Sequence, residues 1–251
     1  MRILLPPSEG KAAGRRGRPS DVDALSFSGL AGMRREVATA LAVVSGRPDA
    51  PAVLGVGAGV AHEIRRNTVL GEAPALRARQ TYTGVLYDAL DLGSLDPSAR
   101  RRAAGWVWIF SALYGVVRTG DRIAAFRLSM GVDLPGVGPL AAAWRPHLEE
   151  ALRGETGRGL IVDCRSAAYA AAWTPRDDAA DRWVQVRVPG ASHMAKHTRG
   201  LVAREILSDG LDPREPVDLA DALSVAFDVN LTPPSRPGRP WVLDVVPPAG
   251  G

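Results

Sequence analysis

The chain alternates between short, continuous apolar runs and longer segments in which apolar residues recur at helical spacing. Ile3-Leu4-Leu5 predicts a short buried strand that ends at Pro6 and Pro7. From Leu30 to Val44, apolar residues return every three or four positions, which predicts an amphipathic helix. By the same criteria we expect further helices over 100–113, 139–152 and 193–207, and further strands over 159–164, 183–188 and 241–246.

Strands at both ends and in the middle, separated by helices, predict an α/β fold. We expect a single domain over residues 1–251, with a central mixed sheet wrapped by helices. The sequence shows no internal repeat, and the proline-rich stretch 232–240 separates only one terminal strand from the rest.

Composition places the chain among ordinary globular proteins. No segment approaches the roughly 20 continuous apolar residues of a membrane helix, so no membrane partner is expected. The first residues, Met1 to Pro7, are too short a run for a secretory signal. The single cysteine, Cys164, excludes an internal disulfide framework and is typical of a reducing compartment, so we expect the protein in the cytoplasm.

The charge balance is mildly basic, at +4, and is compatible with a polyanionic partner. Nearly all of the 31 basic residues are arginine, and the lysines are Lys11 and Lys196. An ammonium group is compact and titrates more readily than a guanidinium. The two lysines are therefore candidates for positions where such a group is needed, with chance retention as the alternative.

The segment from Ser111 to Gly131 interleaves cations with aromatic and aliphatic residues. It contains Arg118, Asp121 and the pair Phe126-Arg127. Charged groups beside apolar side chains are typical of a cleft that holds an anion. The alternative is a buried ion pair between Arg118 and Asp121 that locks a turn.

A second candidate anion site lies in the glycine-rich segment 51–67. Gly55 and Gly57 alternate with apolar residues, and Arg65-Arg66 follow at the end of a helical pattern. This is the outline of a helix-hairpin-helix element, in which glycines let backbone N–H groups approach a phosphate. The alternative is a glycine-rich connection between two helices.

No specific reaction can be written from the sequence. His193 and His197 have the spacing of helical metal ligands, but no glutamate or cysteine cluster completes a site, so we expect neither metal nor cofactor. The alternative is direct binding of iron by these two histidines. No serine lies in a nucleophile elbow. The Gly10-Lys11 loop lacks the other residues of a nucleotide-triphosphatase phosphate loop, so that class is excluded.

Several of these candidates follow strands or begin helices. If the loops leave one edge of the sheet, their side chains line a single positive cleft, with Tyr82, Tyr114 and Tyr169 nearby. Such a cleft suits the phosphate backbone of double-stranded DNA, or a phosphorylated or nucleoside-like small molecule. The expected anion-binding residues outside the glycine-rich segment are Lys11, Tyr82, Thr83, Arg118, Arg127, Lys196 and Arg199.

Taken together, these motifs resemble the peroxide stress protein YaaA family, also called UPF0246 or DUF328. The motifs span residues 1 to about 207, and the tail beyond about 210 carries little resemblance. They are Ile3 to Lys11, Tyr82-Thr83-Gly84, Leu113 to Arg118 with Asp121, Phe126 to Met130, Trp144, and Ala195-Lys196 through Leu201.

The resemblance implies a cytoplasmic α/β protein that protects against hydrogen peroxide and limits iron-dependent DNA damage. It also implies DNA binding through a positive cleft and a helix-hairpin-helix element, which here matches Leu54 to Ile64. No settled catalytic activity comes with the family.

Two functional hypotheses follow. The first is a sequence-nonspecific DNA-binding protein of the oxidative stress response. The second is an enzyme that acts on a phosphorylated or nucleoside-like small molecule, with Lys11 or Lys196 as its catalytic amine. Replacement of either lysine by arginine separates them, because a DNA clamp tolerates the change and a catalytic lysine does not.

Overall fold

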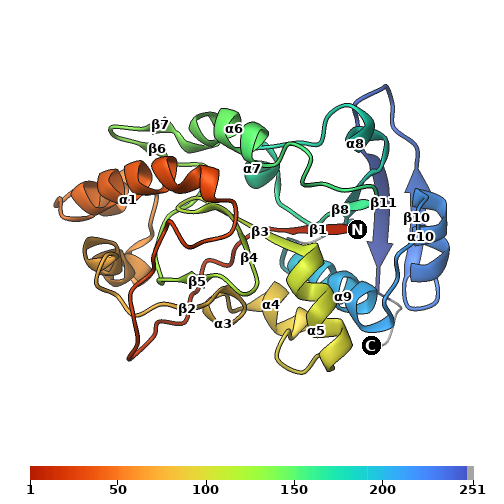
Figure 1. Cartoon of the computed structure of the whole chain (residues 1–251), viewed down its shortest axis with the longest axis horizontal. Coiled ribbons are helices and arrows are strands. Elements are labelled where there is room, and N and C mark those ends of the chain that lie inside the picture. The colour runs from red at the N-terminus through yellow and green to blue at the C-terminus, as the bar shows by residue number, and fades with distance from the viewer. Residues whose placement is uncertain (191, 248–251) are drawn as a thin grey trace.

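The computed structural model describes residues 1–190 and 192–247. Of residues 192 and 193 it describes the helix backbone alone. A seven-stranded sheet forms the centre of this part of the chain (Figure 1). Its strands run in the order β10-β11-β9-β8-β1-β3-β4. Their bounds are β1 (Arg2–Leu5), β3 (Val107–Ser111), β4 (Gly115–Arg118), β8 (Ile161–Asp163), β9 (Trp183–Arg187), β10 (Asp228–Thr232) and β11 (Trp241–Val246).

The five inner strands of the sheet are parallel, and the two edge strands are antiparallel to their neighbours. The prediction of a single α/β domain around a mixed sheet is therefore confirmed. The inner strands β1 and β3 are buried over almost their whole length, as continuous apolar runs in parallel strands require.

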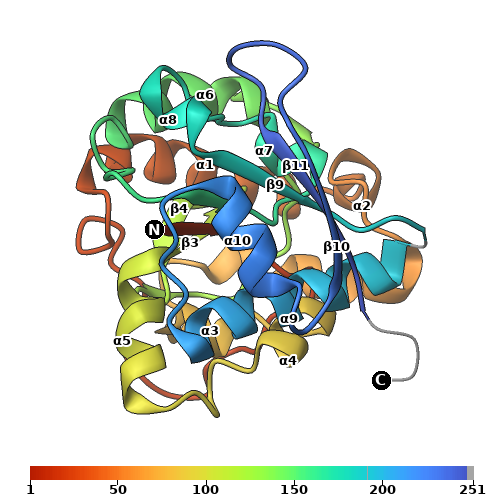
Figure 2. The same cartoon turned by 90° about the vertical axis from the view of Figure 1, so that its right-hand side faces the viewer.

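Helices cover both faces of the sheet (Figures 1 and 2). In both views α6, α7 and α8 lie on one side, and α4, α5 and α9 lie on the other. The bounds of the helices are η1 (Ser28–Leu30), α1 (Ala31–Ser45), α2 (Ala50–Val53), η2 (Ala58–Val69), α3 (Ala78–Thr81), α4 (Val85–Leu90), α5 (Pro97–Trp106), α6 (Leu140–Ala151), α7 (Ala167–Ala170), α8 (Asp178–Asp181), α9 (Ser192–Asp209) and α10 (Pro216–Leu223). Two small ribbons complete the fold, β2 (Leu76–Arg77) with β5 (Arg122–Ile123) and β6 (Asp133–Leu134) with β7 (Gly138–Pro139).

The helix predicted over 100–113 is wrong in its second half. The chain leaves α5 at Trp106 and continues as strand β3, which pairs with β1. The run Val107–Ser111 is completely buried, so no exposed face gives it a period. A buried strand of this kind has the same apolar pattern as one turn of a buried helix.

The tail beyond residue 210 is part of the main sheet. The chain forms β10 and β11 as an antiparallel hairpin, and β11 pairs in parallel with β9. The proline-rich stretch between these strands is therefore the hairpin connection, and the sequence pattern predicted only the second strand.

The order of the strands reverses beside β1. From β1 the chain adds β3 on one side, and it later places β8 on the other side of β1. In open α/β sheets, clefts form beyond the carboxyl ends of the strands at such a reversal. The loops after β1 and β8 are thus placed to frame a common site.

Candidate functional site

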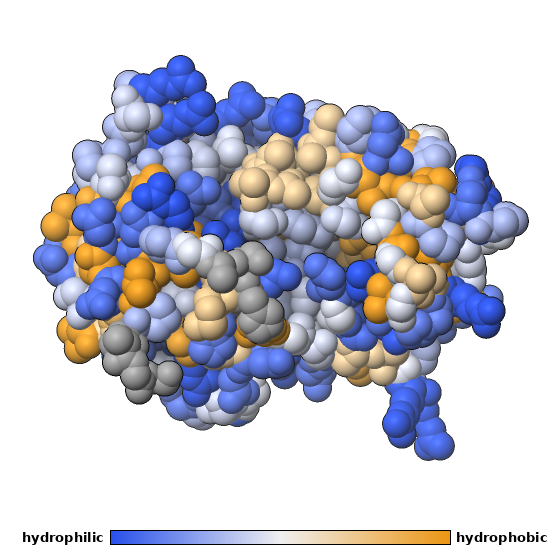
Figure 3. All heavy atoms as spheres, turned by 180° about the vertical axis from the view of Figure 1, so that it is seen from behind, coloured by the Kyte–Doolittle hydropathy of each residue, from blue (hydrophilic) through white to orange (hydrophobic). Residues whose placement is uncertain are grey.

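A cleft of about 620 Å³ lies at this position. Its walls come from the loops after β1 and β8, the loop before η2, the start of α4, the segment around Arg127 and the first half of α9. Seen from behind, the molecule is hollowed near its middle, and hydrophilic residues lie in the hollow (Figure 3). The charged residues that line the cleft are Glu9, Lys11, Arg127, Lys196 and Arg199.

Lys11 is buried at the base of the loop that follows β1. Its Nζ donates hydrogen bonds to the main-chain oxygens of Ser8, at 2.7 Å, and Glu9, at 3.3 Å. Nζ also lies near two aromatic rings, 4.3 Å from the centre of the Phe126 ring and 5.8 Å from that of Tyr82. Only 7% of the residue is exposed. The loop therefore folds around its own lysine.

Burial first, and then the charge of Arg127, lower the pKa of Lys11 to about 7. The carboxylates of Glu63 and Glu9 oppose the shift, since a nearby negative charge stabilises the ammonium form. Because desolvation dominates, the amine exchanges its proton near neutral pH. Such an amine suits proton transfer or nucleophilic chemistry better than an amine that stays protonated at neutral pH.

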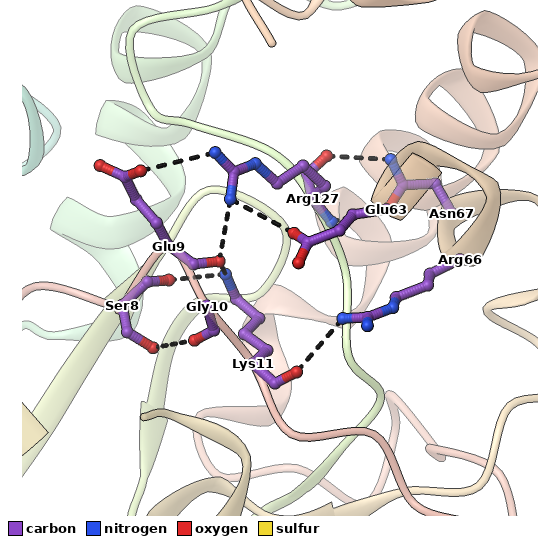
Figure 4. A network of polar contacts seen from close by, with 8 residues as sticks. All are labelled: Ser8, Glu9, Gly10, Lys11, Glu63, Arg66, Asn67 and Arg127. Atoms are coloured by element: carbon purple, nitrogen blue, oxygen red, sulfur yellow. Dashed lines mark hydrogen bonds and ion pairs between the residues drawn. The ribbon is translucent and has the colours of Figure 1, made fainter. Parts of the chain in front are cut away.

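Arg127 is held in place from two sides. The buried Asn67 accepts a hydrogen bond from the Arg127 N–H at 2.8 Å and donates one to its carbonyl oxygen at 2.9 Å. Glu63 lies 3.3 Å from the guanidinium (Figure 4). The backbone and the side chain of this arginine are thus fixed before any ligand arrives.

Glu9 lies between two cations at the mouth of the cleft. Its carboxylate is 3.4 Å from the guanidinium of Arg127 and 3.8 Å from Nζ of Lys196. The side chains of Glu9 and Lys196 are 76% and 57% exposed. Both contacts are long and solvated, so each contributes about 1 kcal/mol or less.

Three other predicted residues support the cleft in different ways. Arg199 lines it, and its Nε donates to the carbonyl oxygen of Val186 at 3.3 Å. Arg66 donates to the carbonyl oxygen of Lys11 at 3.2 Å. Thr83 lines the wall, and its N–H donates to Oγ of Ser8 at 3.0 Å.

Tyr82 does not face the cleft, contrary to expectation. It is 2% exposed, stacks on Tyr87 at 5.4 Å and forms an isolated β-bridge with Lys11. Burial raises the pKa of its hydroxyl above the ordinary value. Tyr114 is likewise buried, while Tyr169 does line the cleft. Tyr82 therefore forms part of the apolar surroundings of Lys11.

Arg118 lies outside the cleft, so the expectation that it lines one cleft with the other basic candidates is wrong; those other candidates are Lys11, Arg127, Lys196 and Arg199. Arg118 pairs with Trp108 near the start of β3. Strand β4 runs antiparallel to β3, so it carries the chain back to the end of the sheet that lies opposite the cleft. There the Arg118 guanidinium lies over the ring of Phe27 at 5.3 Å and 3.5 Å from Glu155. Its role is therefore separate from that of the cleft residues.

The turn after β4 is held by Asp121, although not through the expected ion pair with Arg118. The Asp121 carboxylate accepts from the backbone N–H of Arg118 at 2.8 Å, and from the N–H and hydroxyl of Ser26 at 3.1 and 2.9 Å. The guanidinium of Arg118 points instead to Glu155. The carboxylate locks the turn, but its partners are mainly backbone groups.

The glycine-rich segment forms part of the cleft wall. Gly55 lines the cleft with φ of 62°, and Gly57 and Arg65 are exposed outside the lining. The segment connects the four-residue helix α2 to η2, which packs mainly against α1. This geometry does not establish a helix-hairpin-helix motif, which stays a prediction.

Sequence reasoning missed Asn67 and Glu63, the two residues that fix Arg127. Both lie within the segment singled out for its glycines, yet nothing local indicates a partner some 60 positions away. It also missed the fully buried ion pair between Asp163 and Arg165, at 2.7 Å, directly before Ser166 at the cleft wall.

Among the side chains that the structure describes, those of residues 1–190 and 194–247, no three metal-binding groups come together. The side chain of His193 lies outside the described residues. None of the helices described combines the length and the apolar character that a membrane crossing demands.

The fold and its cleft define an α/β protein with a cleft beyond the carboxyl ends of parallel strands, at the reversal of strand order. A family model described as peroxide stress protein YaaA matches residues 1–230. The chain therefore belongs to the family of the peroxide stress protein YaaA, also designated UPF0246.

Individual relatives match over different shares of the chain. A UPF0246 protein of Streptomyces coelicolor is 46% identical over 255 residues, which covers 98% of both chains. One of Corynebacterium efficiens is 37% identical, over 98% of this chain and 100% of the relative. One of Cereibacter sphaeroides is 32% identical, over 65% of this chain and 68% of the relative. The similarity thus continues beyond residue 210, where the motifs carry little resemblance.

Proposed function

We propose that this protein acts in the defence against peroxide by binding the phosphate backbone of double-stranded DNA at the Lys11 cleft. The observation that carries the proposal is the meeting of Arg127, Lys196 and Arg199 with the Gly55 loop around one cleft. The family description supports the peroxide role. In this role the protein limits damage to the DNA that it covers.

The contacts of this cleft suit phosphate better than base edges. Arginine and lysine side chains and glycine-loop backbone groups neutralise phosphates and carry no sequence information. Arg127 is fixed in advance by Asn67 and Glu63, so a phosphate gains its contact without first ordering the arginine. We therefore expect binding that is insensitive to sequence and sensitive to salt.

The proposal is tested by fluorescence anisotropy with short duplexes of two unrelated sequences over a series of salt concentrations. If the three exposed or half-buried cations each neutralise a phosphate, log K falls with log salt at a slope of roughly −3, because each phosphate contributes about −0.9. Arg127→Gln makes the slope less negative by about 0.9, the contribution of one phosphate contact. Arg118→Gln is the matched control, since it removes the same charge at the end of the sheet opposite the cleft.

Absence of duplex binding, or a slope near zero, would contradict this proposal. Equal losses from Arg127→Gln and Arg118→Gln would also count against it, because net charge alone would then explain the affinity.

A second candidate function is an enzyme that acts on a phosphorylated or nucleoside-like small molecule. The specific observation in its favour is the buried Lys11 amine at the cleft, with its pKa near 7. The cleft volume of about 620 Å³ also lies in the range of small-molecule sites. Lys11 would then supply the proton transfer or the nucleophile, and the exposed cations would hold the phosphate.

The surroundings of Lys11 decide which substitution can separate the two functions. An arginine does not fit the space that Lys11 fills between Phe126 and the Ser8 carbonyl, so Lys11→Arg disturbs the loop under either hypothesis. Lys196 is exposed, and Lys196→Arg preserves the charge there. Lys11→Met keeps the apolar stem but removes the amine together with its bonds to the Ser8 and Glu9 carbonyls. If circular dichroism shows that the variant is folded, it retains duplex binding under the first hypothesis and loses activity under the second.

A further inference from the structure

The one carboxylate among the described charged residues of the cleft lies where an anionic ligand would be expected. Each oxygen of Glu9 faces a different cation, with Oε2 3.4 Å from Arg127 and Oε1 3.8 Å from Lys196 (Figure 4 shows the Arg127 contact). A phosphate group also presents several oxygens to several cations at once. The carboxylate thus has the partners that a phosphate would use.

The two sides of this contact differ in how firmly they are held. The Arg127 side chain is 17% exposed and is anchored through Asn67 and Glu63. The Glu9 side chain is 76% exposed, and its carboxylate contacts only these two cations among the described residues. A competing anion can therefore displace the carboxylate into water without moving the arginine.

The backbone beneath Glu9 is independent of its side chain. Lys11 holds the main-chain oxygens of Ser8 and Glu9, and Oγ of Ser8 donates to the Gly10 carbonyl at 2.5 Å. Arg127 also donates to the Glu9 carbonyl oxygen, at 3.4 Å. Rotation of the Glu9 side chain breaks none of these bonds, so the loop stays in place while the carboxylate leaves.

We propose that Glu9 marks the phosphate subsite of the cleft, where its carboxylate is an internal competitor that a ligand phosphate displaces. This inference rests on the proposed function, since double-stranded DNA and a phosphorylated small molecule both carry a phosphate. The two Glu9 contacts are long and solvated, and a phosphate accepts more hydrogen bonds than a carboxylate, so it wins the exchange; a terminal phosphate or pyrophosphate also carries more charge. The carboxylate excludes weaker anions in the meantime.

The test is an isothermal titration of inorganic pyrophosphate into the wild type, Glu9→Gln and Glu155→Gln. Glu155 is the matched control, because it is an exposed carboxylate 3.5 Å from an arginine, but at the end of the sheet opposite the cleft. Removal of two solvated ion pairs predicts that Glu9→Gln binds pyrophosphate about 3- to 10-fold more tightly than the wild type. Glu155→Gln is expected to bind like the wild type.

Equal or weaker binding by Glu9→Gln overturns the proposal, as does an equal gain in Glu155→Gln or the failure of all three proteins to bind pyrophosphate. Parallel titrations with a short DNA duplex and a nucleoside monophosphate identify the natural source of the phosphate. If pyrophosphate binding shows the Glu9 effect and the duplex does not bind, the subsite stands and the DNA proposal falls. If the duplex binds without a Glu9 effect, the reverse holds.

Discussion

Asn67 and Arg127 are joined by two hydrogen bonds in opposite directions, from the Arg127 N–H to Asn67 Oδ1 and from Asn67 Nδ2 to the Arg127 carbonyl oxygen. The asparagine thereby mimics a strand neighbour and fixes the backbone of the arginine at the cleft. Because Asn67 is fully buried, water cannot replace these bonds when the side chain is removed.

Asn67→Ala should therefore lower the free energy of unfolding by about 2–4 kcal/mol, since it leaves buried backbone groups without partners. Urea unfolding followed by circular dichroism measures the change. Ser45→Ala is the control, because it removes only the third bond of Asn67, at 3.0 Å, and should cost about 1 kcal/mol. Equal losses in the two variants would show that the pair with Arg127 contributes little.

Gly200 allows α9 to lie against α4. A Cβ at this position would lie 2.3 Å from the Leu86 carbonyl oxygen and 2.8 Å from Cβ of Ala89, and neither atom can move away freely. We expect Gly200→Ala to destabilise the protein by about 1–3 kcal/mol through overpacking. Gly105→Ala, in α5, should instead be neutral or stabilising by about 0.5–1 kcal/mol, because nothing lies within 4 Å of the added carbon. A stable Gly200→Ala would contradict the packing described for these helices.

The Lys11 pKa gives stability a pH dependence of known sign. In the native state this pKa is about 7, against 10.5 in the unfolded chain, so between these values the unfolded chain binds the extra proton. The native state therefore gains stability as the pH rises through this window, by about 1.4 kcal/mol per pH unit at most. Below pH 7 the ammonium is present in both states, and the burial cost is constant.

This dependence is measured as the difference in unfolding free energy between the wild type and Lys11→Met from pH 6 to pH 10, so that the other titrating groups cancel. The wild type should gain on the variant as the pH rises. Lysine labelled with ¹³C at Cε gives a direct check, since the chain contains only two lysines and Lys11→Met assigns the signals. A Lys11 titration midpoint near 10 would contradict the account.

Cys164 should not react with peroxide in the native protein. It is completely buried, and burial raises its pKa to about 12, so the reactive thiolate is scarce. A thiol reagent should label Cys164 only after unfolding, and hydrogen peroxide should leave the mass of the peptide that contains Cys164 unchanged. Since Cys164 is the sole cysteine, we expect that any protection by this protein does not pass through a thiol. Rapid sulfenic acid formation in the folded protein would disprove this.

Where one face of an element is buried, its pattern was sufficient to predict it. The helix expected over 30–44 is α1 at Ala31–Ser45, and the strand expected over 183–188 is β9 at Trp183–Arg187. Strand β3 escaped prediction because it is buried on both faces, carries no period and begins directly after α5 with no loop between them. Its assignment depends on pairing with β1, which is remote in the sequence.

The candidate site was predictable in part for the same reason. Lys11 and Lys196 stand out by residue type alone in an arginine-rich chain, and the structure places both at one cleft. Arg118 was misplaced because the β3–β4 hairpin reverses the chain, which local spacing does not reveal. Asn67 gave no signal, since its importance lies wholly in contacts with residues far away in the chain.

The central claim is that phosphate groups bind at the cleft around Lys11, and amide chemical-shift mapping of the ¹⁵N-labelled protein during titration with a short duplex tests it most directly. The account predicts that the amides which shift belong to the loop 8–11, the Gly55 loop, the Thr83 turn and the segment around Arg127, with a smaller response at added salt. Shifts that cluster instead around Arg118 and Glu155, or a spectrum that does not change, would contradict it.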